Sequence, residues 1–340
     1  MKTPICIALI VLLINNSCKE KPAVIESFNG LAQGTTYSIV YDDNMNFEPD
    51  SLKSRVEKIL DDFDMSLSIY KDSSILSRVN RNEDISVDSY FREAYYKSVE
   101  ISELTGGAFD ITVGQLVSSW GFGPDEQKNF RESRLDSLLK LTGMSKVKLV
   151  NDKIVKDDPG IKLDFNAIAQ GYSVDVVYDY LEGLGFENYL IEIGGEVRVR
   201  GKKAGQNWRI GIDRPTDNNM IPGNDLEAVI RISDEALATS GNYRKFYVEN
   251  GVKYSHTIDP HTGYPAKNNL LSATIIAPDC ATADGIATAC MVMGVDKAKE
   301  FIQKYPQFAA HFIYSDEQGN FMTWTSESLK ERVTESDQPQ

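Results

Sequence analysis

Apolar residues recur at helical spacing in several stretches of the chain. Between residues 49 and 66 they fall on one helical face, and Pro49 stands where a helix can begin. The same pattern predicts helices over 88–105 and 133–141, and the pair Gly106-Gly107 ends the first of them. Three more helices are predicted over 167–184, 282–293 and 296–304.

Alternating or β-branched runs predict strands between these helices. Two hairpins are expected, one over 244–258 with Asn250-Gly251 in its turn and one over 309–324 around Gly319. Further strands are predicted at 35–41, twice within 147–155 around Asn151-Asp152, and at 189–200, 207–212, 227–232 and 271–277. Helices and hairpins alternate irregularly, which favours an α+β fold with mixed, mostly antiparallel sheets flanked by helices.

The N-terminus has the layout of an export signal. Lys2 precedes an uncharged apolar run over 5–14, which is too short to span a bilayer as a helix. The run is followed closely by Cys18, an arrangement typical of bacterial lipoprotein signals. We expect a signal peptide over 1–17, a tether over 18–27, one domain over 28–325 and a polar tail over 326–340. Cleavage nearby without lipidation is the alternative, in which Cys18 has no special role.

The chain is acidic, with 36 basic and 50 acidic residues and a net charge of −14. Such a balance argues against nucleic acid as a partner, because phosphates need a basic footprint. If the protein binds an anionic substrate, it needs positive charge close to that substrate, and a divalent cation is one source of it.

The four cysteines do not form an obvious disulfide set. Cys6 and Cys18 belong to the expected signal and lipid site. If 282–293 is helical, Cys280 and Cys290 lie about 12–15 Å apart along the axis, beyond the reach of a disulfide of about 7 Å. We expect two buried free thiols.

Four segments are more polar or richer in glycine than packing requires. The first is 105–112, followed by WGFG at 120–123, in which the glycines can be a plain helix stop. The second is 163–175, where Asp164 or Asn166 can cap a helix beginning at Ala167, and a helix N-terminus can also bind an anion.

The third segment, 256–265, begins with His256 at the end of a strand, where it is either a core histidine or a functional imidazole. The fourth is 280–294. Asp284 and Thr288 are four residues apart and share one helix face, with Asp284 expected in the first turn. They either cap and bond locally or offer hard oxygen ligands to Mg²⁺.

Taken together and in this order, these segments resemble the ApbE family of FAD:protein FMN transferases, over roughly residues 28–325. The fold implied is a single ApbE-like, T-fold-related domain. The matching pieces are GLAQGTTY, YKDSSILSRVN, TGGAFDITVGQL with WGFG, DFNAIAQGYSVD, IEIGGEVRVRG, HTIDPHTGYP and TADGIATA.

The resemblance implies roles for individual residues. Asp284 and Thr288 would coordinate Mg²⁺, or Mn²⁺, with the main-chain carbonyl of Ala167. His256 and Asp284 would be catalytic, with His256 as the candidate that takes the acceptor's hydroxyl proton and Asp110 or Asp284 as the alternatives for that role. The FAD site would be lined by Gln33, Tyr70, Ala108, Phe109, Asp110, Asp164, Gln170 and Ile258. Gln33 stands where a Met is common, and Gln170 where many members have Lys or Glu.

The activity implied is Mg²⁺-dependent transfer of FMN from FAD to a Thr or Ser of another protein, with release of AMP. The acceptors implied are exported or membrane flavoproteins, such as subunits of Rnf and Na⁺-pumping quinone reductase (Nqr) complexes. The protein itself would be anchored through Cys18 and face the periplasm. Alternatives are an FAD pyrophosphatase that releases FMN and AMP, a lipoprotein that binds FAD without turnover, and a plain structural lipoprotein.

Overall fold

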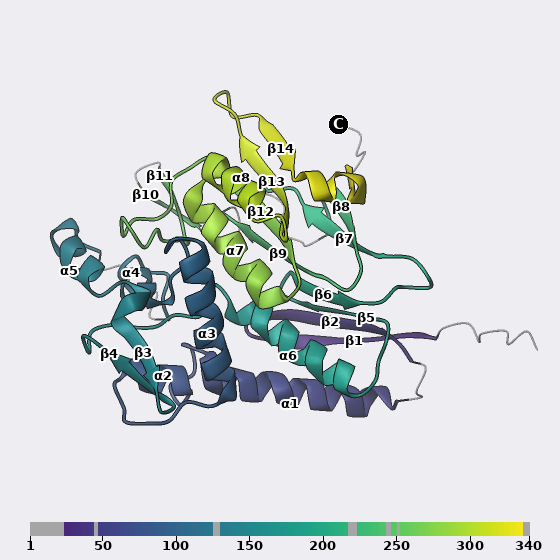
Figure 1. Ribbon diagram of the computed structural model, residues 1–340, viewed down its shortest axis with the longest axis horizontal. Helices are drawn as coiled ribbons and strands as arrows, with labels where there is room; N and C mark the ends of the chain where they lie inside the picture. The colour runs from purple at the N-terminus through teal and green to yellow at the C-terminus, as the bar shows by residue number, and fades with distance from the viewer. Residues whose placement is uncertain are drawn as a thin grey trace, which may run out of the picture.

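A large antiparallel sheet forms the centre of the protein (Figure 1). The computed structural model describes residues 24–43, 47–124, 130–216, 223–242, 246–249 and 252–335. The sheet has eight strands in the order β1-β2-β5-β6-β9-β12-β13-β14, and every neighbouring pair is antiparallel. The strands are β1 (Ile25–Ala32), β2 (Thr35–Asp42), β5 (Tyr189–Ile193), β6 (Glu196–Arg200), β9 (Ala236–Gly241), β12 (Leu270–Ala277), β13 (Ala309–Ser315) and β14 (Phe321–Thr325).

The longer helices gather on one face of this sheet, as Figure 1 shows. The α+β class predicted from the sequence is therefore confirmed. The helices are α1 (Pro49–Leu67), α2 (Ile75–Asn80), α3 (Ser89–Leu104), α4 (Gly114–Ser119), α5 (Leu135–Lys140), α6 (Ala169–Gly183), α7 (Cys280–Met293) and α8 (Val295–Lys304). Short 3-10 turns lie at Ile111–Val113, Glu132–Arg134, Met144–Lys146 and Glu327–Arg332.

A smaller antiparallel sheet covers the other face of the large one. It consists of β15 (Val333–Glu335), β8 (Leu226–Ile232) and β7 (Trp208–Asp213), in that order. Apolar side chains of both sheets form one buried cluster between the layers, including Val199, Ile276, Ile313, Ile212 and Ile230. Strand β12 is thus buried on both faces, which explains why its sequence, LLSATIIA, is mostly apolar without alternating with charged residues.

Two short hairpins lie outside these sheets. β3 (Val147–Val150) pairs with β4 (Lys153–Lys156), and Asn151 and Asp152 between them have φ of 50° and 57°. Two positive φ values match the turn predicted there. β10 (Phe246–Glu249) pairs with β11 (Val252–Ser255), so this hairpin is confirmed, whereas its Asn-Gly turn lies outside the described residues.

The structure corrects both predicted ends of the domain. Strand β1 begins at Ile25, inside the segment expected to be a tether, because it pairs along the whole of β2. The tail expected from Ser326 onward is folded as far as Glu335. Leu329 is fully buried, and β15 completes the smaller sheet. The remaining predicted signal and Cys18 lie outside the described residues.

Sequence patterns also missed details inside the domain. The single strand predicted over 189–200 is two strands, because Gly194 and Gly195 turn the chain with φ of 63° and 107°. Strand β9, with the sequence ALATSG, was not predicted, since small residues give no alternation. It nevertheless lies between β6 and β12 in the centre of the sheet.

Cys280 and Cys290 are free and fully buried, as predicted from their helical separation. Burial raises the pKa of both thiols, so neither is reactive as a thiolate near neutral pH. Within the described part of the chain, no helix is both long enough and apolar enough to cross a membrane.

His311 is a buried polar residue in β13. Its side chain is 2% exposed, and Nδ1 lies 2.9 Å from Oγ1 of Thr325. Nε2 has no hydrogen-bond partner among the described residues. Burial lowers the pKa of the imidazole from 6.5 to about 4. The folded protein therefore holds this ring neutral in a pH range where the unfolded chain takes up a proton.

This difference predicts a loss of stability in acid. Because the folded-state pKa is the lower one, the unfolded chain binds the proton first as the pH falls below 6.5. The free energy of unfolding therefore has its full value above pH 6.5 and decreases by about 3 kcal/mol as the pH falls toward 4. Urea unfolding at pH 7 and pH 4.5 should show a smaller acid loss for His311→Phe than for the wild type. His261→Gln, at a side chain that is 58% exposed, should keep the wild-type loss. Equal losses in all three proteins would contradict the assignment to His311.

Candidate active site

The centre of the candidate site is the contact between α6 and α7. The backbone N–H of Gly171 in α6 donates to Oδ2 of Asp284 in α7 at 3.0 Å. The helices touch so closely here that a Cβ on Gly171 would lie 2.4 Å from the carbonyl oxygen of Cys280. Only glycine permits this approach. Gly171 therefore allows the first turn of α6 to donate directly to a buried carboxylate.

Asp284 lies deeper in its helix than the sequence suggested. Helix α7 begins at Cys280, with Asp279 as its N-cap, so Asp284 belongs to the second turn and does not cap. The side chain is 6% exposed, and no basic side chain pairs with it among the described residues. Burial raises its pKa to about 7, while the Gly171 N–H opposes the rise and the charge of Asp175 adds to it.

These properties fit a divalent cation. A buried carboxylate without a counter-charge is costly, and a bound cation removes that cost. Thr288 lies one turn further along α7, and its Oγ1 is 3.3 Å from Oγ of Ser240 at the end of β9. The described residues contain no group of three His, Cys, Asp or Glu side chains that could hold a metal. One carboxylate with neutral oxygens is a set that suits Mg²⁺ better than Zn²⁺.

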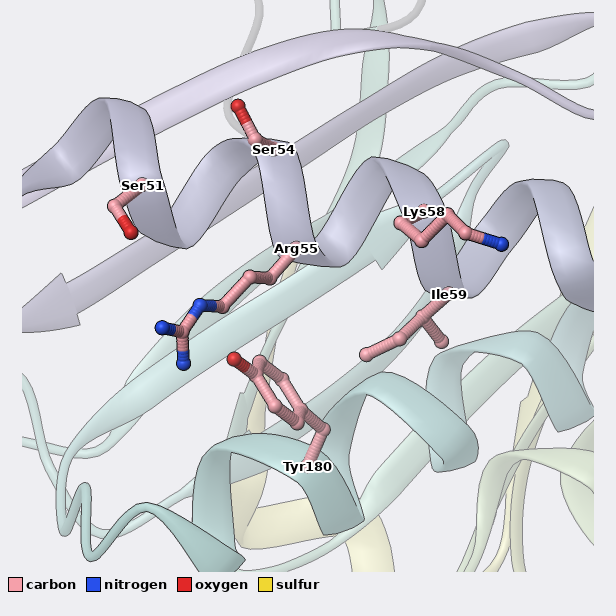
Figure 2. Close-up of a pocket in the computed structure, with 6 residues that line it drawn as sticks. All are labelled: Ser51, Ser54, Arg55, Lys58, Ile59 and Tyr180. Atoms are coloured by element: carbon pink, nitrogen blue, oxygen red, sulfur yellow. The ribbon is translucent and has the colours of Figure 1, made fainter.

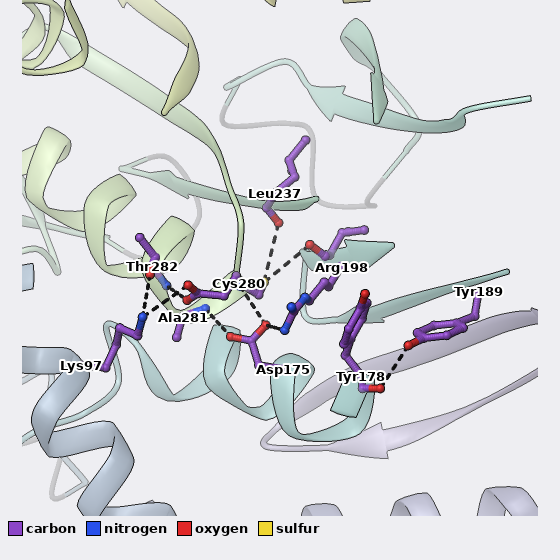
Figure 3. Close-up of polar contacts among 11 residues, drawn as sticks. Lys97, Asp175, Tyr178, Tyr189, Arg198, Leu237, Cys280, Ala281 and Thr282 are labelled. Atoms are coloured by element: carbon purple, nitrogen blue, oxygen red, sulfur yellow. Dashed lines mark hydrogen bonds and ion pairs between the residues drawn. The ribbon is translucent and has the colours of Figure 1, made fainter. Parts of the chain in front are cut away.

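A second polar contact joins the same two helices, as Figure 3 shows. Asp175 of α6 accepts hydrogen bonds from the N–H groups of Cys280 and Ala281, each at 2.8 Å. Nη1 of Arg198 in β6 lies 2.8 Å from Oδ1 of Asp175, and its guanidinium stacks 3.7 Å from the centre of the Tyr178 ring. The sequence segment contained Asp175, but no local pattern marked it.

Asp110 and Asp164 organise the turns that lead to α6. Asp110 accepts from N and Oγ1 of Thr112 and from N of Met144, at 2.6–3.1 Å. Asp164 donates its N–H to the carbonyl of Ile111 and accepts from N of Asn166. Burial raises the pKa of both carboxyl groups. The expectation that Asp164 or Asn166 caps a helix from Ala167 is wrong, because α6 begins at Ala169 without a side-chain cap.

The side chains of Ala108 and Phe109 are part of the core. Ala108 is 6% and Phe109 1% exposed, and both belong to the main core cluster. A Cβ on Gly285 of α7 would lie 3.5 Å from the Phe109 ring. The ring therefore packs against α7 at Gly285. This packing gives Phe109 a structural role, whether or not its backbone contacts a ligand.

Gln33 and Gln170 lie near two tight turns. Gln33, in the β1–β2 turn, has φ of 53°, and its Oε1 accepts from Oγ of Ser173 in α6 at 3.2 Å. A Cβ on Gly194, in the β5–β6 turn, would lie 2.0 Å from Nε2 of Gln170. The β1–β2 turn and the first turn of α6 thus place the two predicted glutamines at one end of the sheet.

The segment 256–265 forms a separate wall with α4 and α5. Ile258 bridges to Pro265 and is 6% exposed in a cluster with Leu116 and Trp120. The His256 ring is partly buried and lies 6.4 Å from the Phe122 ring, measured between centroids. The wall is tied to α4 by a hydrogen bond from Nε1 of Trp120 to the carbonyl of Gly263.

His261 also lies in this segment, although sequence analysis assigned it no role. Its Nε2 is 3.1 Å from the carbonyl oxygen of Gly106, and its Nδ1 is 3.2 Å from Oδ1 of Asp259. A Cβ on Gly107 would lie 3.3 Å from the ring. His261 therefore joins two of the polar segments. A signal for it was present, since a second histidine stands five residues after His256.

Tyr70 differs from the other predicted residues because its side chain is 62% exposed. It lies on the loop between α1 and α2, where its N–H donates to Oγ of Ser68. A pocket of about 540 Å³ lies elsewhere, between α1 and α6 (Figure 2). None of the predicted site residues lines it. Its lining residues are Ser51, Ser54, Arg55, Lys58, Ile59 and Tyr180.

The fold and this helix pair define an α+β protein with a buried carboxylate between two helices. Comparison identifies the class further: the chain belongs to the ApbE family, whose model matches residues 33–312. The chain is 35% identical to the FAD:protein FMN transferase of Vibrio cholerae, over 95% of this chain and 97% of that protein. It is 36% identical to the enzyme of the same name from Haemophilus influenzae, over 97% of both chains.

Solved structures agree with the sequence comparison. The flavin transferase ApbE from Vibrio cholerae superimposes with a TM-score of 0.82 at 34% identity, covering 92% of this chain and 100% of that one. The apo form of the flavinyl transferase ApbE from Pseudomonas stutzeri gives 0.81 at 32% identity, covering 91% and 97%. At this identity and coverage the similarity extends over nearly the whole fold.

Proposed function

We propose that this protein is an FAD:protein FMN transferase that requires Mg²⁺. The observation that carries the proposal is the α6–α7 contact, which holds Asp284 buried and without a basic partner among the described residues, one turn from Thr288. The names of relatives that match nearly the whole chain support the same activity.

In this proposal Asp284, Thr288 and the carbonyl of Ala167 hold the metal ion. Mg²⁺ bound there would offset the negative charge of the FAD pyrophosphate and stabilise the charge that develops during transfer. Turns around Asp110 and Asp164, together with Gln33, Gln170 and Ile258, would form the walls of the FAD site. The ring of Tyr70, which is largely exposed, would stack on the flavin.

The chemical step is a substitution at phosphorus. The hydroxyl oxygen of an acceptor Thr or Ser forms a bond to the phosphorus on the FMN side of FAD, and the bond from that phosphorus to the bridging oxygen breaks. AMP leaves, and FMN remains attached through a phosphoester. We assign the hydroxyl proton to His256, because an imidazole can accept a proton near neutral pH. The acceptor would be an exported or membrane flavoprotein, such as an Rnf or Nqr subunit.

Mass spectrometry of a Thr-containing acceptor domain tests this proposal. After incubation with the signal-less protein, FAD and Mg²⁺, the acceptor should gain the mass of FMN, and AMP should appear in equal amount. EDTA should prevent the gain. Free FMN and AMP with an unchanged acceptor would instead indicate an FAD pyrophosphatase. If FAD stays intact with each of several acceptors, the protein would instead be one that binds FAD without turning it over.

We also propose that the protein is exported and anchored through a lipid on Cys18, facing the periplasm. The support is the N-terminal sequence pattern alone. Membrane fractionation compares the wild type with Cys18→Ser. The wild type should sediment with membranes and the variant should not, and equal sedimentation would contradict the anchor.

A further inference from the structure

The contacts between α6 and α7 occur in a regular register. Gly171 of α6 donates to Asp284 of α7, and Asp175 of α6 accepts from Cys280 of α7. Residues 171 and 175 are four apart, as are 284 and 280, so each pair lies on one helix face about 6 Å apart along the axis. The helices therefore run antiparallel at this contact, with two polar bonds one turn apart.

The two bonds differ in direction. At the first position α6 is the donor and α7 the acceptor, whereas at the second α7 is the donor and α6 the acceptor. Each helix thus uses amides of its own first turn, which have no intrahelical partner, to bind an aspartate of the other helix. Two reciprocal bonds fix both the sliding and the rotation of α6 against α7.

The same spacing leads to the proposed metal ligands. One further step of four residues from Gly171 and Asp284 reaches Ala167 and Thr288. The carbonyl of Ala167 comes from the segment before α6, and the other two ligands come from α7. Their mutual distance therefore depends on how the two helices are aligned. A shift between α6 and α7 would separate ligands that no covalent link holds together.

We propose that Asp175 is a positioning residue for the metal site, which it aligns by fixing α6 against the N-terminus of α7. The proposal rests on the magnesium site proposed above. Asp175 is 6% exposed, and both of its oxygens are used by Cys280 and Ala281. Arg198 of the sheet holds the carboxylate in this orientation and is itself stacked on Tyr178.

Asp279 provides a matched comparison. It also caps α7, accepting from the N–H of Thr282, and it contacts Lys97 of α3. Unlike Asp175, it belongs to the start of α7 itself, and among the described residues its side-chain hydrogen bonds go to Thr282 and Lys97 rather than to α6. Removing it weakens the helix start without releasing the α6–α7 alignment. If both aspartates act only by capping α7, removing either one should change the metal affinity equally. If Asp175 aligns the metal ligands, only its removal should lower the metal affinity.

The test is metal affinity, measured without any acceptor protein. The whole chain without the predicted signal is titrated with Mn²⁺ in the presence of FAD, and free Mn²⁺ is followed by electron paramagnetic resonance. For Asp175→Asn we expect the dissociation constant to rise at least about tenfold, as is usual when residues that orient metal ligands are changed. The asparagine can accept from only one of the two amides, and its own N–H₂ group opposes the other donors. Asp279→Ala should stay within about twofold of the wild type.

Circular dichroism checks that each variant is folded. If Asp175→Asn does not fold, Arg198→Gln serves instead, because it leaves the cap bonds and removes the ion pair together with the stacking on Tyr178. It should raise the dissociation constant at least about threefold. A folded variant with wild-type Mn²⁺ affinity, or an equal loss in Asp279→Ala, would overturn the positioning role. A wild-type chain that binds no Mn²⁺ would overturn the proposed metal site and this inference with it, whereas normal binding without FMN transfer would overturn the function alone.

Discussion

Asp284→Ala is expected to reduce the rate of FMN transfer at least about 1000-fold. If the metal ion stabilises the transition state by several kcal/mol, loss of its one carboxylate ligand removes most of that term, and each 1.36 kcal/mol is a factor of ten in rate. The measurement is the initial rate of FMN incorporation into an acceptor domain, followed by mass spectrometry. A rate within tenfold of the wild type would contradict the assignment of Asp284 to the metal.

Asp284→Asn separates this effect from folding. The amide oxygen can still accept from the N–H of Gly171, while the charge that attracts the cation is lost. In metal-free buffer the variant should be at least as stable as the wild type, because an uncompensated buried carboxylate is costly. Its transfer rate should nevertheless fall nearly as far as that of Asp284→Ala. A variant that is inactive because it is unfolded would be recognised by its thermal unfolding curve.

Gly171→Ala is expected to have the second large effect. The added Cβ would lie 2.4 Å from the carbonyl oxygen of Cys280 and 2.8 Å from the Cβ of Asp284, so backbone must move. Overpacking of this kind costs about 1–3 kcal/mol. It should also displace α6 from α7 and lower the transfer rate at least about tenfold. Urea unfolding and the acceptor assay measure the two consequences.

Gly183 in the same helix is the matched control. It is the last residue of α6, has no positive φ, and a Cβ there would meet nothing within 4 Å. Gly183→Ala should therefore leave transfer unchanged and stabilise the protein by up to about 1 kcal/mol, because alanine is the better helix former. Equal behaviour of the two variants would show that the close approach at Gly171 does not matter.

Local sequence patterns predicted most helices because their apolar residues are regularly spaced. The helix predicted over 49–66 is α1, observed from Pro49 to Leu67. Patterns failed where small residues carry no alternation, as in β9, and where a folded tail is highly charged, as in 326–335. In both cases neighbouring strands supply the stabilisation, and a local pattern does not contain them.

The candidate site shows the same division. Family motifs placed Asp284, Thr288, Gln170 and His256 among the candidates, and a spacing of four put Asp284 and Thr288 on one face of a helix. The positions of the predicted residues within the fold differ widely, since the Phe109 ring lies in the core while Tyr70 is largely exposed. Both residue types are aromatic, and sequence alone gave no measure of their burial.

Residue types and spacings along the chain were enough to predict the mixed helix and strand content, the two free thiols and the resemblance to the ApbE family. The folded structure was needed to show which helix faces Asp284, that Asp175 binds the start of α7, and that His311 is held neutral. Helix contacts and desolvation arise between segments that are distant in sequence, such as residues 171 and 284. Periodicity identifies a buried face, but only packing identifies what that face contacts.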